Sequence, residues 1–130
     1  MLFFAENLSI LIKKLSIVIP AYNEGRTIHF ILDKVKAVHL VGGLEKEVII
    51  VNDCSKDNTV EAIHRYQAEN PDMPIQFFSH EVNMGKGAAL HTGISKATGD
   101  VVIIQDADLE YDPREFNDCL LYTSDAADEL

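Results

Sequence analysis

The segment Val101-Val102-Ile103-Ile104-Gln105-Asp106-Ala107-Asp108 decides the fold class that this chain is predicted to have. Four consecutive β-branched apolar residues predict a strand buried on both faces, as in the middle of a parallel sheet. Side chains alternate along an extended backbone, so Asp106 and Asp108 should project to the same side of its end. Ligands of open α/β sheets bind at the carboxyl ends of the strands. The segment therefore predicts a parallel sheet with a polar site at one edge.

Two carboxylates held this close repel each other, and one would take up a proton unless a cation lies between them. Mg²⁺ and Mn²⁺ prefer oxygen ligands, and Mg²⁺ keeps positions open for substrate phosphates. A solvated acidic turn is the alternative, and the acidic pair alone does not distinguish the two. The remaining sequence has to decide between them.

The composition is that of a single globular domain with a hydrophobic core: 130 residues, 47% apolar and 25% charged. A net charge of −10, with no cluster among the 11 Lys and Arg residues, argues against nucleic-acid binding. Cys54 and Cys119 have neither metal-site nor disulfide-framework spacing, so a reducing, cytoplasmic location is expected.

Residues 1–13 are predicted to be a lead-in to the domain. Met1–Ile12 contains Glu6, is too short to span a bilayer and lacks the features of a signal peptide; a membrane-surface anchor is the alternative.

Strands and helices are predicted to alternate four times. The predicted strands are Leu15–Ile19 (closed by Pro20), Glu47–Val51, Ile75–Ser79 and Val101–Ile104. Helices are predicted from Ile28, from about Val60 with Asp57 or Asn58 as its cap, from Gly85-Lys86-Gly87, and at 112–115. On the third helix, Leu90, Ile94 and Ala97 are predicted to face the core. This alternation predicts an α/β fold: a parallel sheet wrapped by helices, with right-handed crossovers.

Polar residues follow three of these strands and should meet at one edge of the sheet. Tyr22 offers an aromatic face, Glu24 an acceptor, and Asp53 an acceptor for a ring N–H of uracil or guanine. Lys86 lies at a predicted helix start, where backbone N–H groups and a cationic side chain suit phosphate. Each residue alone also fits a structural role, as a packed aromatic, a helix-entry acid or a solvated lysine. Their occurrence together, in this order, favours a nucleotide site.

Two other phosphate-handling motifs do not fit the spacing. Gly85-Lys86-Gly87 lacks the Walker pattern, which needs an earlier Gly and a following Ser or Thr. A haloacid-type phosphatase has its Asp-x-Asp motif after the first strand, followed by Gly-Thr. Here the motif follows the fourth strand and precedes Leu109-Glu110.

Four ordered segments resemble family 2 glycosyltransferases of the GT-A fold, most closely the dolichol- or polyprenol-phosphate mannosyl- and glucosyltransferases. The segments are Ser16–Glu24, Val51–Thr59, Asn83–Leu90 and Gln105–Pro113. The resemblance covers about Lys14 to Phe116. It implies that residues 14–118 are the nucleotide-sugar-binding half of a glycosyltransferase domain, with the sheet cut off after the fourth strand and the Asp-x-Asp loop.

The resemblance also implies roles for the matched residues. The implied donor-binding residues are Pro20, Ala21, Tyr22, Glu24, Val51, Asp53, Lys86, Asp106, Ala107 and Asp108. Asp106 and Asp108 are the implied catalytic residues and, with Glu110, the implied ligands of Mg²⁺ or Mn²⁺. Asn52 and Cys54 stand where the family commonly has Asp and Gly, and His91 stands where it often has Arg.

The implied reaction is inverting transfer of a hexose from a nucleoside-diphosphate sugar of the GDP-mannose or UDP-glucose type. A polyprenyl phosphate acceptor is already anionic near neutral pH and needs no general base, whereas a glycan hydroxyl would need one, and no convincing base is present. The alternatives are a non-catalytic nucleotide-sugar-binding module and a metal-dependent Asp-x-Asp phosphatase.

Residues 119–130 resemble the translation of a sequencing adaptor, so we hypothesise that this segment is not natural protein. On that hypothesis the acceptor-binding half and any membrane-attaching segments lie downstream. The chain alone is then expected to bind the donor weakly, if at all, and to transfer no sugar. A natural acidic tail is the alternative origin of residues 119–130. If membrane-attaching segments lie downstream, the protein could act at the inner face of the membrane, which is the alternative to a purely cytoplasmic location.

Overall fold

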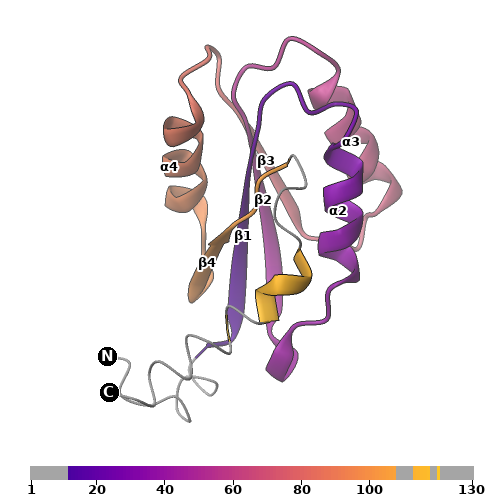
Figure 1. Cartoon of the computed structure of the whole chain (residues 1–130), viewed down its shortest axis with the longest axis vertical. Coiled ribbons are helices and arrows are strands. Elements are labelled where there is room, and N and C mark those ends of the chain that lie inside the picture. The colour runs from indigo at the N-terminus through magenta and orange to yellow at the C-terminus, as the bar shows by residue number, and fades with distance from the viewer. Residues whose placement is uncertain (1–11, 108–112, 118–119, 121–130) are drawn as a thin grey trace.

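The computed structural model describes residues 12–107, 113–117 and 120, and its centre is a sheet of four parallel strands (Figure 1). The strands are β1 (Lys14–Ala21), β2 (Glu45–Asn52), β3 (Ile75–Ser79) and β4 (Val101–Ile104). Their order across the sheet is β3-β2-β1-β4. The predicted α/β class is confirmed, and the predicted bounds of β3 and β4 match residue for residue.

Helices cover both faces of the sheet (Figure 1). α2 (Ile28–Ala37) and α3 (Thr59–Glu69) lie on one face, and α4 (Lys86–Lys96) lies on the other. Two short 3₁₀ turns, η1 (Val41–Gly43) and η2 (Pro113–Glu115), complete the described elements. Within the described part of the chain, no helix is both long and apolar enough to cross a membrane.

The alternation of side chains along β1 and β2 divides the core into two layers. Ile17 and Ile50 belong to the larger layer, beneath α2 and α3, whereas Val18 and Ile49 belong to the smaller layer, beneath α4. These two strands are buried because they occupy the middle of the sheet and carry helices on both faces.

The expectation that Val101–Ile104 is a central, fully buried strand is wrong for the described residues. β4 pairs only with β1 and lies at the sheet edge, where Ile104 is 43% exposed. A run of β-branched residues indicates a strand but does not tell which strands will flank it.

The strand order matters for function. Successive strands add outward from β1 to β3, and then the chain returns to the other side of β1. Such a reversal opens a crevice at the carboxyl ends of the strands.

Of the three residues of the third helix that were predicted to face the core, Leu90 and Ala97 pack partly buried against the smaller layer, but Ile94 is 47% exposed, so the prediction is wrong for Ile94. The buried residues of α4 are Ala89 and Gly93. The physical reason is the close approach of α4 to the sheet, because a Cβ at Gly93 would lie 2.3 Å from Val18 Cγ1. Small residues therefore face the sheet, and the larger apolar residue is displaced outward.

β1 does not end before Pro20 as predicted but continues to Ala21. Lys14 and Val18 direct their carbonyls toward the β4 side, accepting from Asp100 and Gln105, so Pro20 faces that side too. β4 has already ended at Ile104, which pairs with Val18. The missing N–H of Pro20 therefore costs no hydrogen bond of the sheet.

Candidate functional site

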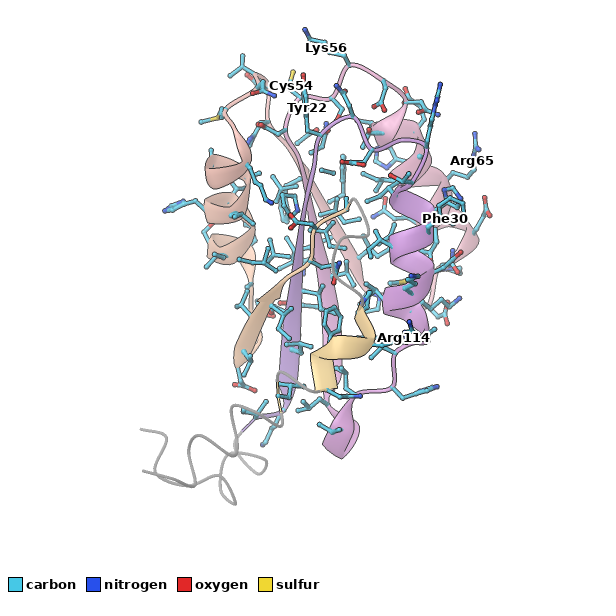
Figure 2. All side chains as sticks on the ribbon, in the orientation of Figure 1. Tyr22, Phe30, Cys54, Lys56, Arg65 and Arg114 are labelled. Carbon is cyan, nitrogen blue, oxygen red and sulfur yellow. The ribbon has the colours of Figure 1, made fainter. Side chains whose placement is uncertain are left out.

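A cleft of about 460 Å³ lies at the carboxyl ends of β1, β2 and β4, beside the start of α4. Its lining residues are Pro20, Ala21, Tyr22, Glu24, Asp53, Asn83, Gly85, Lys86, Ala89, Asp106 and Ala107. Figure 2 shows the half-exposed Tyr22 at the end of the molecule where β1 and β2 finish. Eight of the predicted donor-binding residues therefore converge on a single cleft, although they come from four separate segments.

Among the described residues that were predicted to bind the donor, Val51 is the one that does not line the cleft. Its side chain is fully buried and packs with Val18, Ile49 and Ala89 beneath α4. Val51 therefore contributes to the packing between the sheet and α4. Asp108 and Glu110 lie outside the described residues, so their predicted roles as metal ligands stay predictions.

Asp53 follows β2 directly, and its carboxylate is held by the loop that joins β3 to α4. The Oδ1 atom accepts hydrogen bonds from the backbone N–H of Met84 at 2.8 Å and from the ring of His80 at 2.9 Å. The Oδ2 atom accepts from the backbone N–H of Gly85 at 2.8 Å. Burial would raise the pKa of Asp53, but the bonds from Met84, His80 and Gly85 outweigh it and lower the pKa. Asp53 is therefore an ionised acceptor at neutral pH.

His80 orients Asp53 through a hydrogen bond and does not itself line the cleft. Because an ionised carboxylate only accepts hydrogen bonds, the Nδ1 atom of His80 must carry a proton and donate it to Asp53. The opposite ring atom, Nε2, lies 2.9 Å from the hydroxyl of Thr92 on α4. The ring is thus anchored at both nitrogens, with a side chain that is only 11% exposed.

At the other side of the cleft, Lys86 and Asp106 form an ion pair. The Lys86 Nζ atom lies 2.5 Å from Asp106 Oδ1. The Asp106 side chain is 17% exposed and the Lys86 side chain 60% exposed, so both remain accessible from the cleft. Lys86 is the first residue of α4, and the first N–H groups of a helix have no partner within it.

The loops after β1 and β2 are tied together, which fixes the position of Tyr22 and Glu24. The Asn23 side chain accepts from the N–H of Lys56 at 2.8 Å, and the Asp57 carboxylate accepts from the N–H of Gly25 at 3.1 Å. Asp57 also accepts from the N–H of Thr59 at 3.0 Å. Of the two predicted caps of the second helix, Asp57 therefore makes the capping bonds, and Asn58 makes no side-chain cap bond.

The departures from the family pattern in the second segment have structural accounts. Cys54 adopts a left-handed backbone conformation, with φ of 59°, which explains why glycine is common at this position. The side-chain amide of Asn52 donates to Ser79 at 2.7 Å, and its oxygen accepts from the N–H of Ser55 at 3.1 Å. Asn52 therefore holds the loop without a second negative charge beside Asp53.

Sequence reasoning did not identify His80, Asn83, Gly85 or Ala89 as part of the site. The segment Asn83–Leu90 was recognised as a family motif, and that was the available signal for three of them. His80 lies before this segment, and nothing in its local sequence indicates a contact with Asp53, 27 residues earlier. Among the described residues, no group of three or more His, Cys, Asp or Glu side chains could hold a metal ion.

Comparisons with known proteins agree with this architecture. The model of the family "Glycosyl transferase family 2" matches residues 16–128. The match includes part of the segment 119–130, whose foreign origin stays a prediction. Among curated proteins, the chain is 41% identical over 100 residues to dolichyl-phosphate beta-glucosyltransferase ALG5A of Trichomonas vaginalis, covering 72% of this chain and 30% of that protein.

A second relative is undecaprenyl-phosphate 4-deoxy-4-formamido-L-arabinose transferase of Yersinia pestis, 36% identical over 104 residues that cover 80% of this chain and 32% of that protein. The chain thus spans about a third of the length of the curated relatives that it matches.

Solved structures of glycosyltransferases share the fold. The mannosyltransferase PcManGT from Pyrobaculum calidifontis, solved with GDP-Man and Mn²⁺, superposes with a TM-score of 0.70 at 26% identity, over 92% of this chain and 33% of that one. TarS of S. aureus, residues 1–349 solved with UDP-GlcNAc, gives a TM-score of 0.69 at 24% identity, over 86% of this chain and 31% of that one. The four-stranded parallel sheet with its helices is therefore part of a GT-A fold, and the chain belongs to glycosyl transferase family 2.

Proposed function

We propose that this chain is the donor-binding half of a glycosyltransferase that moves a hexose from a nucleoside-diphosphate sugar to a polyprenyl phosphate. The observation that carries the proposal is the placement of Asp53, Lys86 and Asp106 in one cleft. These residues offer an acceptor for a base, a cation for a diphosphate and a carboxylate for a metal ion. The names of both curated relatives, which refer to dolichyl and undecaprenyl phosphates, support the acceptor class.

The cleft offers separate places for the base and the diphosphate of the donor. Asp53 accepts a ring N–H of the base, and Tyr22 presents an aromatic face at the same edge. The start of α4 presents backbone N–H groups and the Lys86 ammonium toward the diphosphate. Because Lys86 also pairs with Asp106, it links the phosphate side of the cleft to the carboxylate side.

The chemistry of Asp106 fits a divalent cation, because a partly exposed carboxylate in a cleft is an oxygen ligand of the kind Mg²⁺ and Mn²⁺ prefer. Asp106, with Asp108 and Glu110 from outside the described residues, would hold this ion. When bound, the ion would neutralise charge that develops on the leaving diphosphate. The Mn²⁺ in the structure of PcManGT supports this part of the proposal.

The proposed reaction inverts the configuration at the transferred sugar carbon, because the acceptor oxygen attacks from the side opposite the diphosphate. A polyprenyl phosphate needs no general base. This agrees with the cleft, where each described carboxylate has a partner: Asp53 pairs with the loop of His80, Asp106 with Lys86, and Glu24 accepts from the Thr27 hydroxyl at 3.0 Å. For such an acceptor we further propose that the whole protein is cytoplasmic and acts at the inner face of a membrane.

A titration of the 130-residue chain tests the donor site. UDP-glucose, GDP-mannose and inorganic phosphate are titrated by calorimetry, with and without Mn²⁺. We expect weak, Mn²⁺-dependent binding of a nucleotide sugar and no binding of phosphate alone. Asp106→Asn and Asp108→Asn should each remove the Mn²⁺ dependence, whereas Glu81→Gln, an exposed acid on the neighbouring loop, should not.

Two results would contradict the proposal. Unchanged Mn²⁺-dependent affinity in both aspartate variants would remove the metal role. Hydrolysis of a phosphomonoester without nucleotide-sugar binding would show an Asp-x-Asp phosphatase instead.

A further inference from the structure

The carboxylate of Asp53 has a countable number of places for hydrogen bonds. An ionised carboxylate has two oxygens with about two acceptor places each. On Oδ1 both places are filled, by the N–H of Met84 and the ring of His80. On Oδ2 one place is filled, by the N–H of Gly85. A single acceptor place therefore remains for a ligand, and it lies on Oδ2.

We propose that His80, by filling the second acceptor place of Asp53 Oδ1, makes this cleft select a base with one ring N–H, such as uracil, over guanine. The inference deepens the proposed function and rests on it, because it assumes that the cleft binds a nucleotide sugar. In this role His80 is a positioning residue that sets specificity through Asp53 without touching the donor.

The donor patterns of the two bases explain the selection. Uracil presents one N–H in its ring, which one acceptor place can satisfy. Guanine presents a ring N–H and an adjacent amino group, and a carboxylate pairs with both only when each oxygen has a free place. Here the amino group would meet Oδ1, which already accepts two hydrogen bonds. Guanine must then leave a buried donor unpaired or displace His80.

The surroundings of His80 make its displacement unfavourable. Its second ring nitrogen is bonded to Thr92 on α4, so the ring is held from both sides. The side chains of His80 and Asp53 are only 11% and 5% exposed, so water does not readily replace a lost contact. The same loop is fixed by the amide of Asn83, which donates to the backbone carbonyl of Asp53 at 3.2 Å.

The test compares nucleoside diphosphates on the ¹⁵N-labelled 130-residue chain in the presence of Mn²⁺. The amide signals of Met84 and Gly85, which bond Asp53, report binding. UDP, GDP and IDP are titrated, since IDP has the purine ring and single ring N–H of guanine without its amino group. We expect UDP to bind about 10-fold to 100-fold more tightly than GDP, as one unpaired buried donor implies. IDP should bind more tightly than GDP, which separates the amino group from ring size.

Two variants assign the selection to His80. His80→Leu empties one place on Oδ1, so the ratio of UDP to GDP affinity should fall toward one. His80→Asn keeps a short N–H donor toward Asp53 and should retain the ratio. The comparison of IDP with GDP on the unmodified chain does not depend on either variant folding.

Several outcomes would overturn the inference. Equal or tighter binding of GDP than of UDP and IDP would show that Asp53 accepts two donors. An equal loss of UDP and GDP affinity in His80→Leu would show that His80 only stabilises the loop. Binding of neither UDP nor GDP would contradict the proposed function itself, whereas a GDP preference leaves the proposed function standing and removes this inference alone.

Discussion

The two ends of the same sheet each hold a buried carboxylate, and the two carboxylates differ in whether an acceptor place remains for a ligand. At the amino end, Glu47 of β2 accepts from Ser16 at 2.6 Å and from the N–H of Thr98 at 2.7 Å, and it pairs with Lys14 at 3.3 Å. Gln76 adds a fourth partner at 3.4 Å. At the carboxyl end, Asp53 has three partners and lines the cleft.

The difference separates a structural acid from a binding acid. Hydrogen bonds hold the pKa of both side chains low, so a lowered pKa alone does not distinguish their roles. The partners of Glu47 come from β1, β3 and the loop between α4 and β4, so the carboxylate joins three segments. Both oxygens of Glu47 have partners from the protein that fill their acceptor places, whereas Asp53 keeps one place on Oδ2. Glu47 should therefore determine stability, and Asp53 should determine ligand binding.

The largest effect is expected for Glu47→Ala. The free energy of unfolding should fall by about 2–4 kcal/mol, because Ser16 and Thr98 lose their acceptor at about 1–3 kcal/mol each. Urea denaturation measures the change. Glu45→Ala is the matched control, since Glu45 is an exposed residue of the same strand and should cost at most about 0.5 kcal/mol. Equal stability of the two variants would break the comparison.

Stability should also depend on pH through Glu47. Burial would raise its pKa, but hydrogen bonds from Ser16 and Thr98 and the contact with Lys14 lower it from 4.5 to about 2. Because the folded pKa lies below the unfolded one, the stabilisation is complete above about pH 4.5 and is lost as the pH falls toward 2.

The expected loss is about 2–3 kcal/mol at about 1.4 kcal/mol per pKa unit. Denaturation curves at pH 6 and pH 3 measure it as the difference between the unmodified chain and Glu47→Gln, which cannot titrate. A pH dependence that is the same in both proteins would assign the acid sensitivity to other carboxylates.

Asp53→Ala should act on binding instead. Affinity for UDP and for UDP-glucose should fall by a similar factor, about 10-fold to 100-fold, or about 1–3 kcal/mol for one lost contact to a buried carboxylate. Calorimetric titration in Mn²⁺ measures both ligands, and Glu81→Ala on the neighbouring exposed loop is the control. A loss confined to Mn²⁺ binding would show that Asp53 does not contact the base.

The smallest effect is expected in α4, which connects the two ends. Alanine in a helix normally stabilises by up to about 1 kcal/mol relative to glycine, and Gly87→Ala should do so because its Cβ would meet no atom within 4 Å. Gly93→Ala should instead destabilise by about 1–2 kcal/mol, since its Cβ would lie 2.3 Å from Val18 Cγ1. Thermal unfolding of the two variants measures the difference in sign. Stabilisation by both would mean that α4 can move away from the sheet without cost.

The residues of the cleft were largely predictable because their signals are local. Tyr22, Glu24, Asp53 and Asp106 each come shortly after a run of mainly apolar residues, and parallel strands bring such positions to one edge. The third and fourth strands were predicted with their observed bounds for a similar reason, since both are short, largely apolar segments bounded by proline, glycine and polar residues.

What the sequence determined by itself is the alternation of strands and helices, the parallel sheet and the family motifs at its edge. Only the tertiary structure decided which described strand lies at the edge, that Val51 packs beneath α4 and does not line the cleft, and that Ile94 faces outward. It also decided that His80 orients Asp53. The physical reason is that periodicity records whether a side chain is buried, whereas its partner is chosen by packing between segments far apart in the chain. Asp53 and its partners are 27 to 32 residues apart, and only the folded sheet brings them into contact.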